Sequence, residues 1–271
     1  MRGLTGESIR SLGSPLARVV EVHEALASTQ DRARELARAG APHGTLVVAG
    51  VQTGGRGRLR RAWGSPEGGL WMSLVLRPDL EAAAAPRVTQ TAAVAVAKAL
   101  RELGANVGIK WPNDLLVEPG GRKICGILAE SGIRGAAPPE ASCVDHAILG
   151  VGLNANLDPE DLGVPDSEVA TLRHGLGRDV ESLDLLRHLL RNLEDELDRI
   201  HDFAAILDDW RVLNVTLGER VRVRRSGETL EGRAVDLGPG GELHLQTADG
   251  LVELYEGEVE QLRRDIGDRA V

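Results

Sequence analysis

The sequence is poor in lysine, in aromatic residues and in cysteine. Of its 32 basic residues only three are lysines (Lys98, Lys110 and Lys123), and aromatic residues make up 2% of the 271 positions. The core must therefore be built mainly from Leu, Val, Ala and Ile. The two cysteines, Cys125 and Cys143, form no Cys-x-x-Cys pair. The sequence thus indicates neither a disulfide framework nor a structural zinc site.

Long apolar runs and an excess of positive charge are also absent. No stretch approaches the roughly 18 to 20 apolar residues of a membrane span, and the first ten residues lack the apolar centre of a secretory signal. Asp and Glu total 41, which gives a net charge of −9 and a pI of about 5.4. This balance argues against a surface devoted to nucleic acid or anionic lipid. The seven histidines do not fall at metal-ligand spacing. We expect a cytoplasmic protein with no membrane or nucleic-acid partner and no metal site made of protein side chains alone.

Hydrophobic periodicity divides the chain into two structural regions. It predicts strands over 18–24, 44–52, 70–78 and 145–157, helices over 28–40, 82–103 and 182–200, and a hairpin formed by 106–118 and 122–134. From Thr216 the period becomes two, and glycine-containing turns separate short strands, which predicts a small closed β-barrel. We therefore expect a polar N-terminal lead (1–17), an α+β main domain (18–215) and a small β domain (216–266).

Arginines are concentrated in one glycine-rich loop. Arg56, Arg58, Arg60 and Arg61 lie within six residues, and the neighbouring glycines free the backbone between them. Guanidinium and backbone N–H groups could then converge on a multiply charged oxyanion such as a triphosphate. The segment leads into a strand and lacks the GxxxxGK[ST] pattern, so it is not the common phosphate loop. An exposed, solvated basic loop or a nucleic-acid contact would give the same pattern.

Three further segments place polar side chains beside predicted strands. Residues 110–114 (Lys-Trp-Pro-Asn-Asp) combine an extended residue before proline with an Asn-Asp turn. Lys123 has apolar neighbours in its strand, so burying its ammonium costs free energy unless an anion meets it. Asn154 follows a glycine-containing strand and offers both a donor and an acceptor. Each segment also fits ordinary packing: a snorkelling Lys110, an edge-strand Lys123 in water, and a strand end closed by an Asn turn.

Together these segments resemble the biotin protein ligases (biotin–[acetyl-CoA-carboxylase] ligases), specifically the short form without a DNA-binding domain. The matching motifs are STQ at 28–30, GRGRLRRAW at 55–63, KWPNDLL at 110–116, KICGILAE at 123–130 and GVGLNAN at 150–156. The resemblance runs from about residue 18 to 264. It implies an α+β fold, with a mixed or antiparallel sheet and helices in a class II synthetase-like ligase core, plus a small C-terminal SH3-like β-barrel.

The resemblance also implies a two-step acyl transfer. Biotin and MgATP give biotinyl-5′-AMP and pyrophosphate, and the biotinyl group then passes to one lysine of a biotin carboxyl carrier protein of acyl-CoA carboxylases. Biotin, ATP and Mg²⁺ are the expected small molecules, and the metal is expected to enter with ATP. A monomer or a homodimer formed through the main-domain sheet is expected.

By the same resemblance, site residues can be assigned to roles. Lys123, Arg56 and Arg58 are expected to be catalytic. Biotin binding is expected of Ser28, Thr29, Gln30, Gln52, Arg56, Gly57, Arg58 and Lys123. Ser28 is also expected to cap the helix predicted over 28–40, because Asp31 follows it at capping-box spacing. ATP or adenylate binding is expected of Gly55, Arg56, Arg58, Arg61, Trp63, Lys110, Asn113, Asp114, Lys123 and Asn154, with Asp114 near either the metal or the acceptor lysine. Arg60 stands where the family usually has Gly. Because a side chain disfavours positive φ, we expect the loop either to close differently there or to hold the adenylate with altered tightness.

Three other functions are compatible with parts of this pattern. A lipoate–protein ligase shares the fold, although the KWPND and GRGR motifs favour biotin. A biotin-dependent transcription regulator would need a DNA-binding unit, and only about fifteen residues precede the first predicted strand. A biotin-binding module without catalysis would not need the arginine loop or Lys123.

Overall fold

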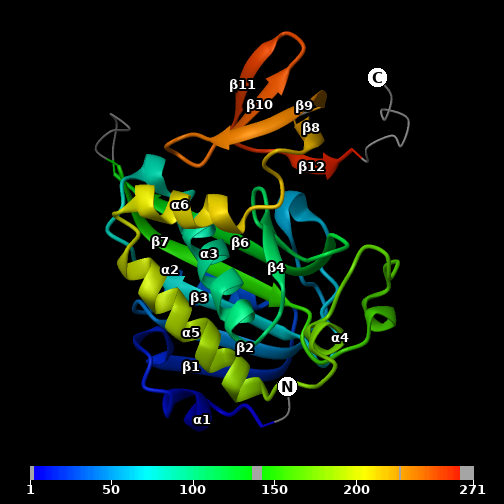
Figure 1. Cartoon of the computed structure of the whole chain (residues 1–271). Helices are drawn as coiled ribbons and strands as arrows, with labels where there is room; N and C mark the ends of the chain where they lie inside the picture. Colours follow the sequence, from blue (N-terminus) through cyan, green and yellow to red (C-terminus); the bar gives the residue numbers. More distant parts are fainter. Residues whose placement is uncertain (1–2, 136–141, 226, 263–271) are drawn as a thin grey trace.

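The computed structural model describes residues 3–135, 142–225 and 227–262, with Arg60 described by its backbone only (Figure 1). The main sheet has seven strands: β1 (Val19–Leu26), β2 (Thr45–Gln52), β3 (Leu70–Leu76), β4 (Val107–Lys110), β5 (Asp114–Val117), β6 (Arg122–Arg134) and β7 (Cys143–Leu153). Their order is β1-β2-β3-β7-β6-β5-β4. Strands β1 and β2 pair in parallel, and the other neighbours pair antiparallel. The predicted mixed sheet is confirmed.

Helices cover both faces of this sheet. The α-helices are α1 (Gly6–Arg10), α2 (Thr29–Arg38), α3 (Arg87–Glu102), α4 (Leu172–Leu176), α5 (Ser182–Asp198) and α6 (Phe203–Leu213). On β2, Val47 clusters with Ala33 and Ala37 of α2, whereas Leu46 and Val48 belong to the main core with α3. Helices α5 and α6 pack on α3 in front of the sheet in Figure 1. The period of two along each strand therefore separates two helix layers.

Five elements differ from the sequence prediction, and two of them, helices α4 and α6, were not predicted. The lead expected to be polar contains α1, which buries Ile9 completely. The Ala-rich segment is a 3₁₀ turn (Ala82–Ala84) followed by α3, which begins at Arg87 because Pro86 occupies its N-cap. The first arm of the predicted hairpin is two strands, β4 and β5. The turn after Lys110 reverses the chain, so that Lys110 pairs with Asp114.

The C-terminal residues form a second, smaller sheet. Its strands are β8 (Arg220–Arg225), β9 (Glu228–Leu237), β10 (Leu243–Thr247), β11 (Gly250–Leu254) and β12 (Glu258–Gln261), in the order β11-β10-β9-β8-β12. All neighbours pair antiparallel, which agrees with the short strands predicted from the period of two. Residues 263–266 of the expected domain lie outside the described residues.

Hydrogen bonds connect the small sheet to the main domain at Trp111. The Trp111 indole N–H donates to the Gly241 carbonyl (3.1 Å), and its backbone N–H donates to Thr216 Oγ1 (3.0 Å). Gln90 of α3 also donates to the Gly241 carbonyl (3.1 Å). Because Trp111 belongs to the 110–114 motif, the small domain is held directly against that motif.

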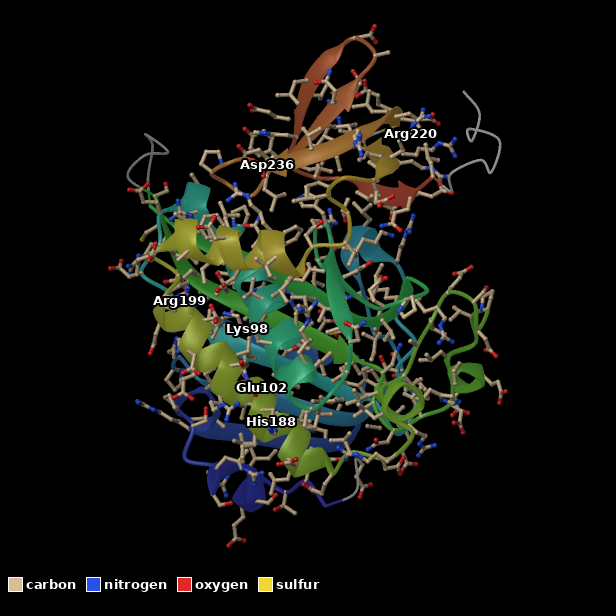
Figure 2. All side chains as sticks on the ribbon, in the orientation of Figure 1. Lys98, Glu102, His188, Arg199, Arg220 and Asp236 are labelled. Atoms are coloured by element: carbon tan, nitrogen blue, oxygen red, sulfur yellow. The ribbon has the colours of Figure 1, made fainter. Side chains whose placement is uncertain are left out.

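An ion-pair network joins α3, α5 and α6, and Figure 2 labels its two cationic members, Lys98 and Arg199. Lys98 Nζ lies 2.6 Å from Glu196 Oε1 and 2.8 Å from Asp209 Oδ2. Arg199 Nη1 contacts the same two carboxylates at 2.9 and 3.2 Å. The Glu196 side chain is only 5% exposed, so its charge depends on these two cations. Lys98 therefore has a structural role.

In the described part of the chain, no helix is long and apolar enough to cross a membrane.

Candidate active site

A cavity of about 1020 Å³ lies on the sheet face that α2 partly covers. On β7, Ile148 packs against α2, and the next residues on that face are Gly150 and Gly152. Because glycine has no side chain, the sheet face is uncovered beside the N-terminal end of α2. The cavity lining contains nearly all the predicted site residues: Ser28, Thr29, Gln30, Gln52, Arg56, Gly57, Arg58, Arg61, Trp63, Lys110, Asn113, Asp114, Lys123 and Asn154.

Gly55 is the predicted residue that does not line the cavity. Gly55 directly precedes Arg56 in the arginine loop, and its carbonyl accepts from the Trp63 backbone N–H (2.9 Å). A Cβ at this position would be 2.6 Å from the Trp63 carbonyl oxygen and 2.7 Å from Ser65 Oγ. Glycine is therefore required for loop packing at this position.

One part of the cavity presents neutral donors and acceptors. The Thr29 backbone N–H and hydroxyl both donate to Gln52 Oε1, at 2.8 and 3.0 Å. The Thr29 hydroxyl also lies 2.9 Å from Ser73 Oγ. Ser28 is the N-cap of α2 and accepts from the Asp31 backbone N–H at 3.3 Å, as the sequence predicted. These groups suit a polar, uncharged ligand.

Gln30 lines the same region, but its amide is already engaged. Its Nε2 donates to Glu130 Oε2 and to the Ile148 carbonyl, both at 3.0 Å, and its Oε1 accepts from Ser73 Oγ (3.1 Å). A Cβ on Gly150 would lie 2.5 Å from that Oε1. The Gln30 side chain therefore forms a fixed part of the cavity wall.

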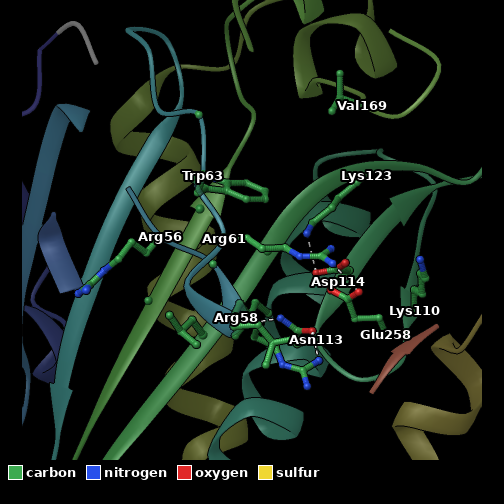
Figure 3. A pocket seen from close by; sticks show the side chains of 18 of the residues that line it. Arg56, Arg58, Arg61, Trp63, Lys110, Asn113, Asp114, Lys123, Val169 and Glu258 are labelled. Carbon is green, nitrogen blue, oxygen red and sulfur yellow. Dashed lines mark hydrogen bonds and ion pairs between the residues drawn. The ribbon is translucent and has the colours of Figure 1, made fainter. Parts of the chain in front are cut away.

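The other part of the cavity is strongly charged, and Lys123 lies in it (Figure 3). Its ammonium is 2.9 Å from Asp114 Oδ1 and 4.8 Å from the centre of the Trp63 ring. The Lys123 and Asp114 side chains are 32% and 23% exposed, so the pair remains accessible from the cavity. Lys123 is thus matched with an anion, as its apolar strand neighbours required.

Arg58 is the most enclosed of the three loop arginines whose side chains are described. Its Nη1 donates to Asn113 Oδ1 (3.2 Å) and to the Gly257 carbonyl (3.3 Å). Burial lowers the pKa of the Arg58 guanidinium from its ordinary value, and the carboxylate of Asp114 opposes this shift. Asn113 is fixed in turn by donating to the Ile127 carbonyl (2.6 Å). The 110–114 motif and the arginine loop are therefore linked through one amide.

The flanking arginines of the loop have carboxylate partners. Arg61 Nη2 lies 2.6 Å from Glu258 Oε2 at the start of β12, and the Arg61 side chain is 67% exposed. Arg56 pairs with Asp31 of α2 and points away from the Lys123–Asp114 pair in Figure 3. Of the three arginines assigned to phosphates, Arg58 and Arg61 thus lie on the Lys123 side, while Arg56 lies on the α2 side.

Trp63 lies across two glycines in the cavity floor. Gly126 and Gly152 are cross-strand partners on β6 and β7, and a Cβ on either would lie 3.1 or 2.6 Å from the indole. Among the described residues, Trp63 Nε1 and Asn154 Oδ1 are buried atoms without a hydrogen-bond partner. Asn154 is held by its Nδ2, which donates to the Ala170 carbonyl (3.1 Å). Asn154 lines the cavity with this acceptor unpaired.

Lys110 lines the cavity from the end of β4. Burial lowers the pKa of its ammonium, and the nearby carboxylate of Asp114 acts in the opposite direction. The turn that reverses the chain between these two residues therefore adds a second, partly desolvated amine to the charged region.

The unusual backbone conformation of the arginine loop lies next to Arg60. Within the described residues, the one non-glycine residue with positive φ is Leu59 (φ 53°, ψ 29°), and it precedes Arg60. The backbone enters the left-handed region at Leu59, and the backbone φ of Arg60 is not positive. A left-handed leucine costs about 1–2 kcal/mol. Leu59 is also 67% exposed, which makes it an apolar residue at the rim of the cavity.

Sequence reasoning did not identify the residues that the small domain contributes. The charged end of the cavity is lined by Gly257, Glu258 and Glu260. The sequence predicted no site residue in this domain. The resemblance extends over these residues, but nothing in their sequence pattern indicates that they face a cavity in the other domain. Glycines inside strands were the available signal for Gly126 and Gly152, because such glycines often mark a close approach.

Comparisons with known proteins agree with this geometry. The sequence model of the Biotin/lipoate A/B protein ligase family matches residues 22–154, and that of the Biotin protein ligase C terminal domain matches residues 216–261. The chain is 38% identical over 243 residues to the bifunctional ligase/repressor BirA of Bacillus subtilis, which covers 88% of this chain and 72% of that protein. The chain belongs to the biotin protein ligase family.

Two other members of the family extend the comparison. A biotin–[acetyl-CoA-carboxylase] ligase of Mycobacterium tuberculosis is 33% identical over 231 residues, covering 81% of this chain and 80% of that protein. The Aquifex aeolicus biotin protein ligase in complex with biotin and ATP superimposes with a TM-score of 0.72 at 27% identity, covering 91% of this chain and 99% of that chain. The fold predicted from the sequence is confirmed.

Proposed function

We propose that this biotin protein ligase activates biotin with ATP to biotinyl-5′-AMP and transfers the biotinyl group to one lysine of a biotin carboxyl carrier protein. The observation that carries the proposal is that a single cavity joins a neutral hydrogen-bonding region to a cationic region that contains Lys123. Biotin has a neutral, polar ureido ring at one end and a carboxylate at the other. The two regions match these two ends in chemistry.

The first step brings two anions together, so the enzyme must supply positive charge and position. Thr29 and Gln52 hold the ureido ring, and the carboxylate of biotin lies beside Lys123. A carboxylate oxygen forms a bond to the α-phosphorus, and the bond from that phosphorus to the pyrophosphate oxygen breaks, with its electron pair leaving on pyrophosphate. Lys123 and Arg58 stabilise the negative charge that develops.

We place the nucleotide base beside Trp63 and Asn154, where Gly126 and Gly152 form the cavity floor. Asn154 Oδ1 is a buried acceptor without a partner in the described residues, and the exocyclic amine of adenine is a donor. The Trp63 indole, which lies on Gly126 and Gly152, provides an aromatic face for stacking. ATP is therefore oriented by one polar and one aromatic contact.

Mg²⁺ is proposed to bind with the triphosphate. Proteins usually hold this ion through one or two carboxylates together with phosphate oxygens. Asp114 is the carboxylate paired with Lys123 in the cavity, and it would supply such an oxygen. When bound, the ion neutralises part of the phosphate charge.

The second step moves the biotinyl group to the carrier. The lysine amine of the carrier attacks the acyl carbon, AMP leaves with the electron pair of the broken C–O bond, and the new amide loses a proton to solvent. No covalent enzyme intermediate is required. Cys125 is fully buried and burial strongly raises the pKa of its thiol, so it is not a thiolate nucleophile.

Biotin is favoured over lipoate because the match to the biotin protein ligase C-terminal domain accompanies the catalytic match. Biotin-dependent exchange of labelled pyrophosphate into ATP, without any acceptor, tests the proposal. We expect exchange with biotin and none with lipoate at the same concentration. Folded protein that shows no exchange in the presence of Mg²⁺ would overturn the proposed adenylation.

A further inference from the structure

A second, smaller hollow adjoins the cavity on the α2 side. It has a volume of about 430 Å³ and shares Arg56 and Arg58 with the main cavity. Arg34 and Arg38 of α2 and Glu130 of β6 complete its charged lining. We call it the arginine hollow. Neither Arg34 nor Arg38 has a role in the proposed chemistry.

The arginine hollow is positive in a protein that is negative as a whole. Arg34 pairs with both Asp31 and Glu130, and Arg56 pairs with Asp31. Two carboxylates therefore face four arginines, while the whole chain carries a net charge of −9. Arg38 is exposed, and in the described part of the chain no ion pair involves it. An anion that approaches this surface meets an uncompensated guanidinium at its outer edge.

The position of the hollow matches a macromolecular substrate better than a small one. Thr29, at the start of α2, lines the main cavity, whereas Arg38 is the last residue of the helix. Nine residues of α-helix span about 13 Å. The hollow thus continues outward along α2 from the cavity that biotin and ATP are proposed to fill. A protein that presents a lysine to the adenylate must cover the surface beside that cavity.

We propose that the arginine hollow is part of the docking surface for the carrier protein, and that it receives acidic side chains that flank the acceptor lysine. This inference rests on the proposed function and adds the chemistry of the partner. Carboxylates on the carrier would meet Arg38 and Arg34, whose guanidinium groups bind carboxylates with two parallel hydrogen bonds. Attraction over this surface would speed encounter and orient the lysine toward the main cavity.

Arg38→Glu tests the inference, because Arg38 lies outside the proposed catalytic and small-molecule binding residues. Arg10→Glu is the matched control: Arg10 is also exposed, ends helix α1 and lines neither cavity. Each variant is assayed for pyrophosphate–ATP exchange and for transfer of biotin to a carrier domain. For Arg38→Glu we expect kcat/KM for the carrier to fall about tenfold or more at low salt, with unchanged exchange and a weaker dependence of transfer on salt.

Several results would overturn the inference. Transfer by Arg38→Glu that equals transfer by Arg10→Glu would exclude the hollow as a docking surface. A parallel loss of exchange would mean that the hollow binds the nucleotide. A change in sedimentation coefficient without a specific loss of transfer would mean that a second copy of the chain binds there. Absence of exchange in the unmutated protein would instead refute the proposed function, so the two failures are distinguishable.

Discussion

Lys123→Met is the perturbation that bears most directly on the proposed chemistry. The ammonium lies 2.9 Å from Asp114 Oδ1 in the cavity. Its loss removes one positive charge from the reacting carboxylate and phosphate, and it also leaves Asp114 as an unpaired anion facing both. Two unit charges about 4 Å apart interact by about 4 kcal/mol at an effective dielectric constant of about 20. This energy corresponds to a loss of about a thousandfold in rate.

Two companion variants separate the two effects. Lys123→Met combined with Asp114→Asn also lacks the ammonium but has no unpaired carboxylate. The amide oxygen of Asn can still contact Mg²⁺ when the metal is saturating, so under that condition we expect the double variant to recover at least about tenfold over the single variant. Lys123→Arg keeps the charge but replaces a compact ammonium with a planar fork, and we expect it to lose about tenfold through misplacement.

The assay is biotin-dependent pyrophosphate–ATP exchange at saturating ATP, with circular dichroism as the control for folding. Exchange by Lys123→Met within tenfold of the unmutated protein would refute the role of the ammonium. A double variant no more active than the single one would refute the role of the exposed carboxylate.

Three other variants test separate contacts. Asn154→Ala should raise the KM for ATP about tenfold and leave the KM for biotin unchanged, because a buried hydrogen bond contributes about 1 kcal/mol and the void left by the side chain adds to the loss. Steady-state exchange rates measured against each substrate give both KM values, and an unchanged KM for ATP would refute the contact. Glu258→Gln should lower the KM for ATP about threefold, since it frees the exposed Arg61; an increased KM would mean that the carboxylate positions Arg61. Lys98→Met should lower the free energy of unfolding by about 2–3 kcal/mol in urea titrations. Burial raises the pKa of Asp209, but hydrogen bonds from Lys98 and Arg199 outweigh it and leave the pKa lowered. That stabilisation is present above the unfolded pKa of Asp209, about 3.9, and is lost as the pH falls through the folded pKa. Lys98→Met should therefore weaken the dependence of stability on acidic pH. An unchanged urea midpoint at neutral pH would refute the structural role of Lys98.

The sequence was sufficient to predict that distant segments meet in one site. Ser28 was predicted as both a helix cap and a cavity residue, and the structure shows it in both places. Lys123 was predicted to need an anion, and Asp114 meets it. These predictions succeeded because helix capping and the cost of burying a charge are local properties of each segment.

Contacts between the two domains were beyond prediction. Glu258 reaches Arg61 from 197 positions away, and this depends on how the small sheet docks on Trp111. Within the main domain, the pairing of Arg56 with Asp31 likewise depends on how α2 and the arginine loop pack together. Helix α1 was missed because its segment buries Ile9 in five residues of otherwise polar or small character. In each case, packing between separate elements determines which polar groups meet.

Transfer of biotin to a carrier domain is the most direct test of the central proposal, because it requires both half-reactions. The unmutated protein is incubated with biotin, MgATP and the carrier domain, and the product is examined by streptavidin blot and by peptide mapping. We predict one biotin on one lysine of the carrier, with no product when ATP is omitted or when that lysine is replaced by arginine. A carrier that remains unmodified beside folded enzyme, or one that accepts lipoate in place of biotin, would contradict the proposal.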